Sequence, residues 1–299
     1  MILRPDYRAH QAFIAPARKA AALWRFIAGF LLAAAGYVFL NQFFFSAVYS
    51  LSGAGGAGLY ERLVLGSTPL AMLLLLFSFG FLTLSVAISV RVMHQRSFLS
   101  LLGPLSVFWR DFRAVAVMLV LISVVLAMLP PWDMGGDYVP NLAFGTWLTL
   151  LPLSLLAVFV QVSAEEIAFR GYVQQQLAAR FRSPLIWMVL PSVLFALGHY
   201  LPDMAGENAL LIAIWAGVFG MLMADLTARS GSLGPAIAVH LVNNLSAILL
   251  VSLPDNMSGL SLYLSPFSMQ DAEAMQAWLP VDFALMIVSW LAARLAIRR

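Results

Sequence analysis

Residues 26–48 read FIAGFLLAAAGYVFLNQFFFSAV, a run without a charged side chain. A helix needs about 20 consecutive apolar residues to cross the hydrocarbon of a bilayer, and this stretch is long enough. It is too long for the core of a cleavable signal peptide, and no small-residue cleavage motif follows it. Five basic residues precede it: Arg4, Arg8, Arg18, Lys19 and Arg25. The stretch therefore predicts a retained first transmembrane helix.

The composition of the whole chain agrees with a lipid environment. Of its 299 residues, 62% are hydrophobic and 10% are charged, whereas about a quarter of the residues in a soluble domain are charged. The chain contains no cysteine, which excludes disulfide bonds, a cysteine nucleophile and thiolate metal ligands. Its basic residues lie between apolar runs rather than on one face. We therefore expect membrane lipid, and no nucleic acid, as a partner.

Seven further runs resemble the first, so the predicted fold class is all-α, a polytopic bundle of about eight transmembrane helices. The predicted spans are 26–48, 67–90, 113–130, 145–167, 184–201, 208–226, 233–253 and 277–297. We expect loops at 52–58, 130–136 and 252–270, and an interfacial helix or loop at 91–112. The chain then divides into an N-terminal segment (1–25), three N-terminal helices (26–130), a four-helix core (145–253) and a C-terminal helix with a basic tail (277–299).

Charge asymmetry predicts the orientation of this bundle. If the N-terminus is cytoplasmic and the helices alternate, every basic residue except Arg62 falls on the inner side. The outer loops instead carry acidic residues, namely Asp133, Asp137, Asp203, Glu207, Asp255, Asp271 and Glu273. Because short positively charged loops stay in the cytoplasm, both ends of the chain are predicted to be cytoplasmic. A different number of helices would place basic residues on both sides of the membrane.

Ionisable residues in apolar helices are expensive and therefore candidates for function. Glu166 and Arg170 are four residues apart and share a helix face, so they can pair. Glu165 points about 100° further round the helix and is free to face something else. Asp225 and Arg229 repeat the four-residue spacing and predict a local ion pair. The Glu165–Arg170 segment is equally compatible with a solvated cytoplasmic helix end.

Two histidines occur in later helices of the same half of the chain. His199 shares a helix face with Phe195, and His240 shares one with Asn244. Each has a structural alternative, because His199 can be a packed interfacial residue and the His240–Asn244 pair can serve helix–helix hydrogen bonding. Asp282, early in the last helix, is expected at the outer interface.

A glutamate, two histidines and an asparagine on three helices can converge on one buried polar cavity. A glutamate can activate water as a general base, and histidine and asparagine can donate hydrogen bonds to a developing oxyanion. This set fits hydrolysis of an amide by an activated water. It also resembles a three-ligand zinc set, although the spacing is not that of a His-Glu-x-x-His helix. The sequence has no Gly-x-Ser-x-Gly element, phosphate loop or dinucleotide fingerprint.

Three short motifs occur in order over about residues 145–250: Glu165-Glu166-x-x-x-Arg170-Gly171, Phe195-x-x-x-His199, and Gly231-Ser232-Leu233 leading into His240-x-x-x-Asn244. Together they resemble the motif set of the CAAX-protease and bacteriocin-processing (CPBP) family. That family comprises the type II CAAX prenyl endopeptidases and their bacterial relatives, which are also called abortive-infection proteins. The first three helices carry none of these motifs.

The resemblance implies roles for the motif residues. Glu165 would be the water-activating base, and His199 would help to hold that water. His240 and Asn244 would form the oxyanion hole. We prefer a metal-free mechanism, with a divalent metal such as zinc on Glu165, His199 and His240 as the open alternative. The resemblance assigns supporting roles to the two remaining charged motif residues, Glu166 and Arg170.

The predicted depths of two of these residues conflict. The span 145–167 puts Glu165 near the cytoplasmic end of its helix, while 184–201 puts His199 near the outer end of the next. The conflict disappears if the first of these helices continues toward Arg180 and the second extends past His199 toward Pro202. We therefore predict a long, tilted or kinked fourth helix.

The function expected from the resemblance is that of an intramembrane endopeptidase acting on a membrane-associated protein or peptide, reached from the cytoplasmic side or from lipid. The alternatives are a non-proteolytic immunity or regulatory binding protein of the same fold, and a proton-coupled transporter, for which no inverted repeat is visible. Arginine far outnumbers lysine, which favours a bacterial origin and a multi-pass protein of the bacterial inner membrane.

Overall fold

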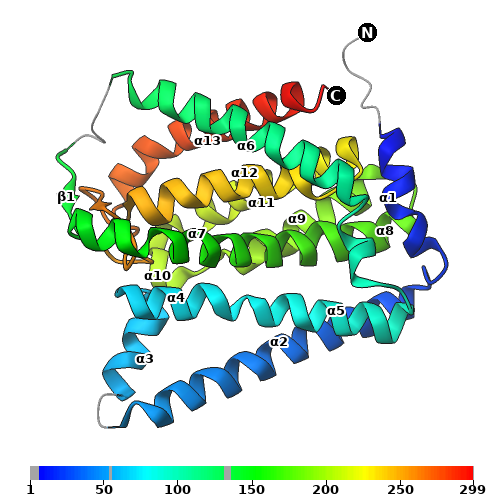
Figure 1. Ribbon diagram of the computed structural model, residues 1–299, viewed down its shortest axis with the longest axis horizontal. Helices are drawn as coiled ribbons and strands as arrows, with labels where there is room; N and C mark the ends of the chain where they lie inside the picture. Colours follow the sequence, from blue (N-terminus) through cyan, green and yellow to red (C-terminus); the bar gives the residue numbers. More distant parts are fainter. Residues whose placement is uncertain (1–6, 54–55, 131–135, 299) are drawn as a thin grey trace.

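The computed structural model describes residues 7–53, 56–130 and 136–298, which form one bundle of helices (Figure 1). Its α-helices are α1 (Arg8–Arg18), α2 (Leu23–Leu51), α3 (Gly56–Leu65), α4 (Pro69–Ser78), α5 (Gly80–His94), α6 (Leu105–Ala127), α7 (Phe144–Glu166), α8 (Gln175–Arg180), α9 (Leu190–Gly198), α10 (Pro202–Ala205), α11 (Ala209–Ser230), α12 (Gly234–Leu245) and α13 (Ala272–Ala296). The shorter helical segments are the 3₁₀ turns η2 (Phe98–Leu101) and η5 (Gly206–Asn208) and the π-helical segments η3 (Ile167–Gln174), η4 (Leu185–Val189) and η6 (Ser246–Leu250).

Local signals in the sequence set several of these boundaries. Thr68 caps α4 with its side chain, and Pro69 occupies the first turn, where a missing N–H costs nothing. Asp271 caps α13 in the same way. Gly231 ends α11 in the left-handed region, at φ +75°. A Cβ there would also lie 2.7 Å from the carbonyl oxygen of Ala9, so glycine lets this turn pack directly against α1.

Among the described residues, five helical stretches are long and apolar enough to cross a membrane: Leu23–Leu51, Pro69–His94, Phe144–Arg180, Pro202–Ser230 and Ala272–Ala296. Two shorter apolar stretches are Leu185–Gly198 and Gly234–Leu250. Large apolar side chains also cover the outside of the bundle; Phe39 and Phe43 of α2, for example, are 69% and 68% exposed. The protein is therefore a polytopic, all-α membrane protein.

The predicted long helix is confirmed, because α7, η3 and α8 run without interruption from Phe144 to Arg180. Other boundaries differ from the prediction. Residues 91–112 are not one interfacial segment, since α5 continues to His94 and α6 already begins at Leu105. The helix containing η4 and α9 ends at Gly198 instead of extending toward Pro202.

Three features of the described residues were not predicted at all. The N-terminal segment contains α1, and the loop expected at 52–58 leads directly into α3. A small sheet of order β1-β3-β2 joins the segments before α7 and after α12, with β1 (Val139–Pro140) antiparallel and β2 (Val251–Ser252) parallel to β3 (Tyr263–Leu264). Two-residue strands carry no periodic sequence signal, which explains their omission.

The centre of the bundle is formed by α7 and α12. They pack against each other, α7 also packs against α4 and α5, and α12 also packs against α6 and α11. On α7 the contact residues Ala157, Val158 and Val162 are completely buried. Because lipid tails are as apolar as these side chains, close packing between helices, rather than burial from water, stabilises such contacts.

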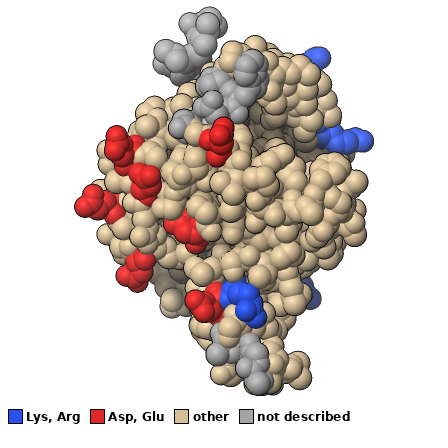
Figure 2. Space-filling model, turned by 90° about the vertical axis from the view of Figure 1, so that its left-hand side faces the viewer, with Lys and Arg blue, Asp and Glu red and all other residues tan. Residues whose placement is uncertain are grey.

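Charged side chains divide the molecule into two ends. The acidic end carries α3, α10, the small sheet and the first turns of α7, α11 and α13, and Figure 2 shows acidic side chains gathered over it. Its acidic residues include Asp137, Asp203, Glu207, Asp255, Asp271 and Glu273. The basic end carries α1, α8, η2 and the last turns of α5 and α13. Three of the charged residues from which the orientation was predicted, Arg4, Asp133 and Arg299, lie outside the described residues.

Candidate functional site

The polar residues of the first motif lie inside the long helix formed by α7, η3 and α8. Glu165 and Glu166 end α7, and the helix then widens into the π-helical segment η3, which contains Arg170. Such π-helical segments are rare and occur often at functional sites. Gly171 lets η3 approach the polypeptide of η2, because a Cβ there would lie 3.2 Å from the carbonyl oxygen of Leu101.

Glu166 is completely buried and held from two sides. Its Oε1 accepts a hydrogen bond from Arg170 Nη1 at 3.0 Å and one from His240 Nδ1 at 2.8 Å. The Arg170 guanidinium is only 1% exposed, and its Cζ lies 4.8 Å from the ring centroid of Phe195. A buried carboxylate needs compensating charge and hydrogen bonds, and Arg170 and His240 provide both. The Glu166–Arg170 pair therefore forms as the helical spacing predicts.

Glu165, the neighbouring residue, is held much less firmly. Its Oε2 lies 3.5 Å from His240 Nε2 and makes no hydrogen bond to any described residue. The side chain lines a large cavity and is 9% exposed. In both glutamates Oε2 makes no hydrogen bond to a described residue. The two carboxylates differ in position: Glu166 is completely buried and bonded through Oε1, whereas Glu165 lines the cavity.

His240, from the middle of α12, lies between the two carboxylates. Because the Glu166 oxygen accepts, His240 Nδ1 carries the proton in their hydrogen bond. Its Nε2 is thereby directed toward Glu165 and the cavity. The rings of Phe219 and Phe195 pack edge-on against the imidazole, with centroids at 5.0 and 6.2 Å, and limit its rotation.

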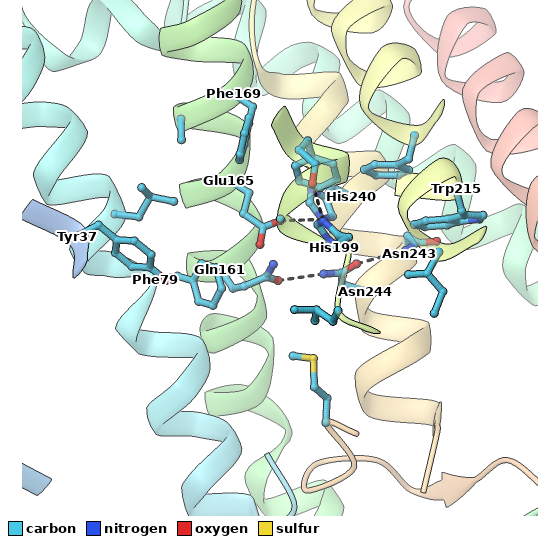
Figure 3. Close-up of a pocket in the computed structure, with 18 of the residues that line it drawn as sticks. Tyr37, Phe79, Gln161, Glu165, Phe169, His199, Trp215, His240, Asn243 and Asn244 are labelled. Atoms are coloured by element: carbon cyan, nitrogen blue, oxygen red, sulfur yellow. Dashed lines mark hydrogen bonds and ion pairs between the residues drawn. The ribbon is translucent and has the colours of Figure 1, made fainter. Parts of the chain in front are cut away.

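His199 follows the last residue of α9 and has left the helix. Its Nδ1 donates to the carbonyl oxygen of Phe195 at 2.9 Å, and its ring lies 4.4 Å from the ring of Phe195. In the neutral imidazole, Nε2 is then an acceptor. Figure 3 shows His199, His240 and Glu165 directed toward the same part of the cavity.

The geometry of the helices resolves the conflict over depth. Glu165 lies 15 residues before Arg180, and His199 lies 14 residues after Leu185. At a rise of 1.5 Å per residue, both side chains start about 21–22 Å from the basic ends of their helices. They reach a common level because the helix of Glu165 is unusually long and that of His199 is unusually short.

Asn244 lies one helical turn after His240 and is oriented by a residue that the sequence analysis did not identify. Its Nδ2 donates to Gln161 Oε1 at 3.0 Å, and its Oδ1 accepts from Asn243 Nδ2 at 3.2 Å. Gln161 is 6% exposed and precedes Glu165 by one turn of α7. An amide at this helical spacing from Glu165, in an apolar stretch, was a detectable signal.

The cavity that these residues line has a volume of about 750 Å³. Its wall is mostly apolar. Tyr37, in α2, and Phe79, the residue directly before α5, face the polar residues (Figure 3). The polar side chains of the motifs gather at one place: Gln161, Glu165, His199, His240, Asn243 and Asn244. Concave, largely apolar cavities with a few convergent polar groups are typical of ligand and active sites.

The described residues contain no group of three His, Cys, Asp or Glu side chains arranged to hold a metal ion. His240 Nδ1 is hydrogen-bonded to Glu166, and its Nε2 faces the Glu165 carboxylate.

Comparison with known proteins gave two matches. Residues 144–246 match the family described as "Type II CAAX prenyl endopeptidase Rce1-like". The chain is also 26% identical over 260 residues to the "Uncharacterized protein YyaK" of Bacillus subtilis (strain 168), an alignment that covers 83% of this chain and 84% of that protein. No solved structure matches the chain. The matched region contains all of the motif residues described above.

Proposed function

We propose that this chain, whose residues 144–246 form a domain of the Rce1-like type II CAAX prenyl endopeptidase family, is an intramembrane endopeptidase that uses a glutamate-activated water. One observation carries the proposal. Glu165 lines a cavity of about 750 Å³, with its Oε2 3.5 Å from His240 Nε2, while its neighbour Glu166 does not line the cavity and accepts two hydrogen bonds on Oε1. A general base must reach the cavity that holds its substrate, and a purely structural carboxylate need not.

In the proposed reaction, Glu165 takes a proton from a water molecule as the water oxygen attacks the peptide carbonyl carbon. The acceptor Nε2 of His199 orients that water. The tetrahedral intermediate then collapses, the C–N bond breaks, and Glu165 returns the proton to the amine that leaves. The products are a carboxylic acid and an amine, so atoms and charge balance without another reactant.

His240 and Asn244 would stabilise the oxyanion of that intermediate. Asn244 has two N–H groups on Nδ2, of which Gln161 accepts one, so the other is available to substrate. His240 can donate through Nε2 only as an imidazolium. In that state the positive charges of His240 and Arg170 balance the negative charges of Glu165 and Glu166, which suits a site at membrane depth. Glu166 and Arg170 hold His240 and so support the site.

The proposed setting is the membrane topology that the charge distribution predicts. Eight segments would cross the bilayer, with both termini in the cytoplasm and residues 145–253 forming the catalytic core. We assign the protein to the bacterial inner membrane. Its substrate would be a protein or peptide that is itself associated with the membrane.

A comparison of peptide termini tests the function and identifies the substrate at the same time. Wild type and Glu165→Gln are expressed at matched levels in membranes, and new peptide termini are compared by mass spectrometry. Glu207→Gln is the matched control, because Glu207 is an exposed residue of the acidic end. We expect termini that wild type and the control produce and Glu165→Gln does not. Identical termini in all three samples would contradict proteolysis through Glu165.

A further inference from the structure

We propose that the peptide bond reaches Glu165 from the acidic end of the molecule, so that the substrate is a segment exposed on the outer side of the membrane rather than a cytoplasmic one. This inference rests on the proposed endopeptidase function and on the proposed orientation. It names the class of substrate, namely exported or lipid-anchored peptides and the outer juxtamembrane segments of membrane proteins.

A thick layer of polypeptide separates the site from the basic end. In α8, Gln175 is completely buried, and its Nε2 donates to the carbonyl oxygens of Phe13 in α1 and Ser100 in η2, at 2.7 and 2.9 Å. The turn before α12 is tied to the same layer, because Leu233 N–H donates to the carbonyl oxygen of Leu102 at 3.1 Å. No residue of α1, α8 or η2 lines the cavity. This layer leaves the catalytic side chains no path to the basic end.

The part of the cavity nearest the basic end is closed by Tyr172. Its hydroxyl lies 3.0 Å from His94 Nε2 at the end of α5 and 3.4 Å from the carbonyl oxygen of Phe26 at the start of α2. Gly29 permits this contact, since a Cβ there would lie 2.2 Å from the Tyr172 hydroxyl. Ser89 adds a hydrogen bond of 2.7 Å to the Gly29 carbonyl oxygen. Three helices thus meet without a gap at this point.

The lining residues at the closed end and at the acidic end of the cavity differ in exposure. At the closed end, Val86 and Tyr172 are each 1% exposed. At the acidic end, Leu201 lines the cavity and is 45% exposed, and the half-buried Asn256 and Met257 line it from the loop after β2. These residues contact both the cavity and the surroundings of the protein.

The course of α2 agrees with this difference. Its buried residues, Gly29 and Ala33, both belong to its first half. Figure 1 shows α2 beside α5 near the basic end and diverging from α4 toward the acidic end, where α3 bridges the widening gap. The cavity residues that α2 contributes, Phe30, Ala33, Ala34 and Tyr37, likewise all belong to its first half.

Thiol accessibility tests the inference directly, since the chain contains no cysteine. Ala168→Cys places one thiol in the cavity, one turn from Glu165 on its basic side. Glu207→Cys and Arg182→Cys report on the acidic and basic ends, where both residues are exposed. Each variant is treated with a membrane-impermeant charged maleimide in spheroplasts and in inverted membrane vesicles. Ala247→Cys repeats the cavity measurement from another wall in case Ala168→Cys does not fold.

We expect Ala168→Cys and Glu207→Cys to react at least tenfold faster in spheroplasts, and Arg182→Cys at least tenfold faster in inverted vesicles. Faster reaction of the cavity thiol in inverted vesicles, or no reaction from either side in both cavity variants, overturns the inference. Reversed behaviour of Glu207→Cys and Arg182→Cys overturns it as well, because the acidic end would then be cytoplasmic. Labelling does not require catalysis, so these outcomes are independent of whether Glu165→Gln abolishes cleavage.

Discussion

Two buried acid–arginine pairs with identical helical spacing have very different surroundings. Beside the cavity, Glu166 and Arg170 pair at 3.0 Å, and the adjacent Glu165 lines the cavity. At the basic end, Asp225 and Arg229 pair at 2.7 Å, and the chain neighbours of Asp225 are the apolar Ala224 and Leu226. The spacing alone therefore does not distinguish a catalytic site from a structural ion pair.

The partners of Asp225 show what the second pair does. Its Oδ1 accepts from the Tyr7 hydroxyl at 2.7 Å, and its Oδ2 accepts from Arg229 Nε at 2.7 Å and Trp290 Nε1 at 2.9 Å. Burial and the contact with Asp225 together raise the pKa of the Tyr7 hydroxyl above its ordinary value. Three donors from three parts of the chain saturate this carboxylate, which fastens the N-terminal segment and α13 to α11. A carboxylate that is bonded through both oxygens to distant parts of the chain stabilises structure, whereas one that lines a cavity can reach a ligand.

The largest effect that this comparison predicts is on catalysis. Glu165→Gln should lower the cleavage rate by about 10²–10⁴-fold, because it removes the general base. It should leave thermal unfolding in detergent nearly unchanged, since Glu165 Oε2 makes no hydrogen bond to a described residue and lies 3.5 Å from His240 Nε2. Cleavage kinetics and thermal unfolding measured on the same preparation check both parts. A large loss of stability would show that Glu165 is structural after all.

Asp225→Asn should have the opposite profile. Removing one charge of a buried, hydrogen-bonded pair should cost about 3 kcal/mol of stability, while the folded fraction should cleave substrate at the wild-type rate. The measurement is denaturant or thermal unfolding in parallel with activity per folded molecule. Glu207→Gln again serves as the exposed control and should change neither quantity. Impaired turnover of the folded fraction would mean that the two regions are coupled.

Gln161→Ala should produce a smaller effect on catalysis. Asn244 would lose the acceptor that fixes its amide, so the oxyanion would be stabilised less well. We expect kcat to fall about tenfold, equivalent to about 1.4 kcal/mol of barrier, with KM unchanged. A change in KM with constant kcat would indicate that Gln161 binds substrate instead of positioning Asn244.

The last prediction concerns pH and the basic end. Burial lowers the pKa of His10, in α1, from 6.5 to about 4. The folded state therefore favours neutral His10, and its contribution to stability is present above pH 6.5 and is lost as the pH falls toward 4. The loss between pH 7 and pH 5 should be about 2 kcal/mol. Thermal unfolding of wild type and His10→Phe at the two pH values checks this, because the variant should lose less stability on acidification.

The sequence predicted which residues come together better than it predicted their depth in the bundle. Glu165, His199, His240 and Asn244 all line the cavity, as their helical positions allowed us to expect. Hydropathy nevertheless ended the predicted fourth span near Glu165. The helix continues beyond that point through polar residues such as Gln175, which are buried in protein rather than in lipid. Hydropathy measures preference for lipid and cannot recognise a polar residue that finds its partners inside the bundle.

Gln161 and α1 illustrate what else was missed. The spacing of Gln161 from Glu165 could have marked it as a candidate, but its contact with Asn244, 83 positions away in the chain, could not be read from the sequence. The α1 helix precedes the first apolar run and follows no membrane-spanning pattern, so its docking against α8 and α11 was not predictable from periodicity. In both cases the information that was missing is a contact between segments that lie far apart in the sequence.

By itself the sequence determined that this chain is a polytopic, helical membrane protein, because a long uncharged run has no other favourable solvent than lipid. It also determined that Glu166 and Arg170 can pair, since four residues on a helix fix their separation. Only the tertiary structure decided which glutamate is bonded to His240 and which lines the cavity, because His240 lies 74 positions away in the chain. The same is true of the common level of Glu165 and His199, which depends on how a long helix and a short one pack together.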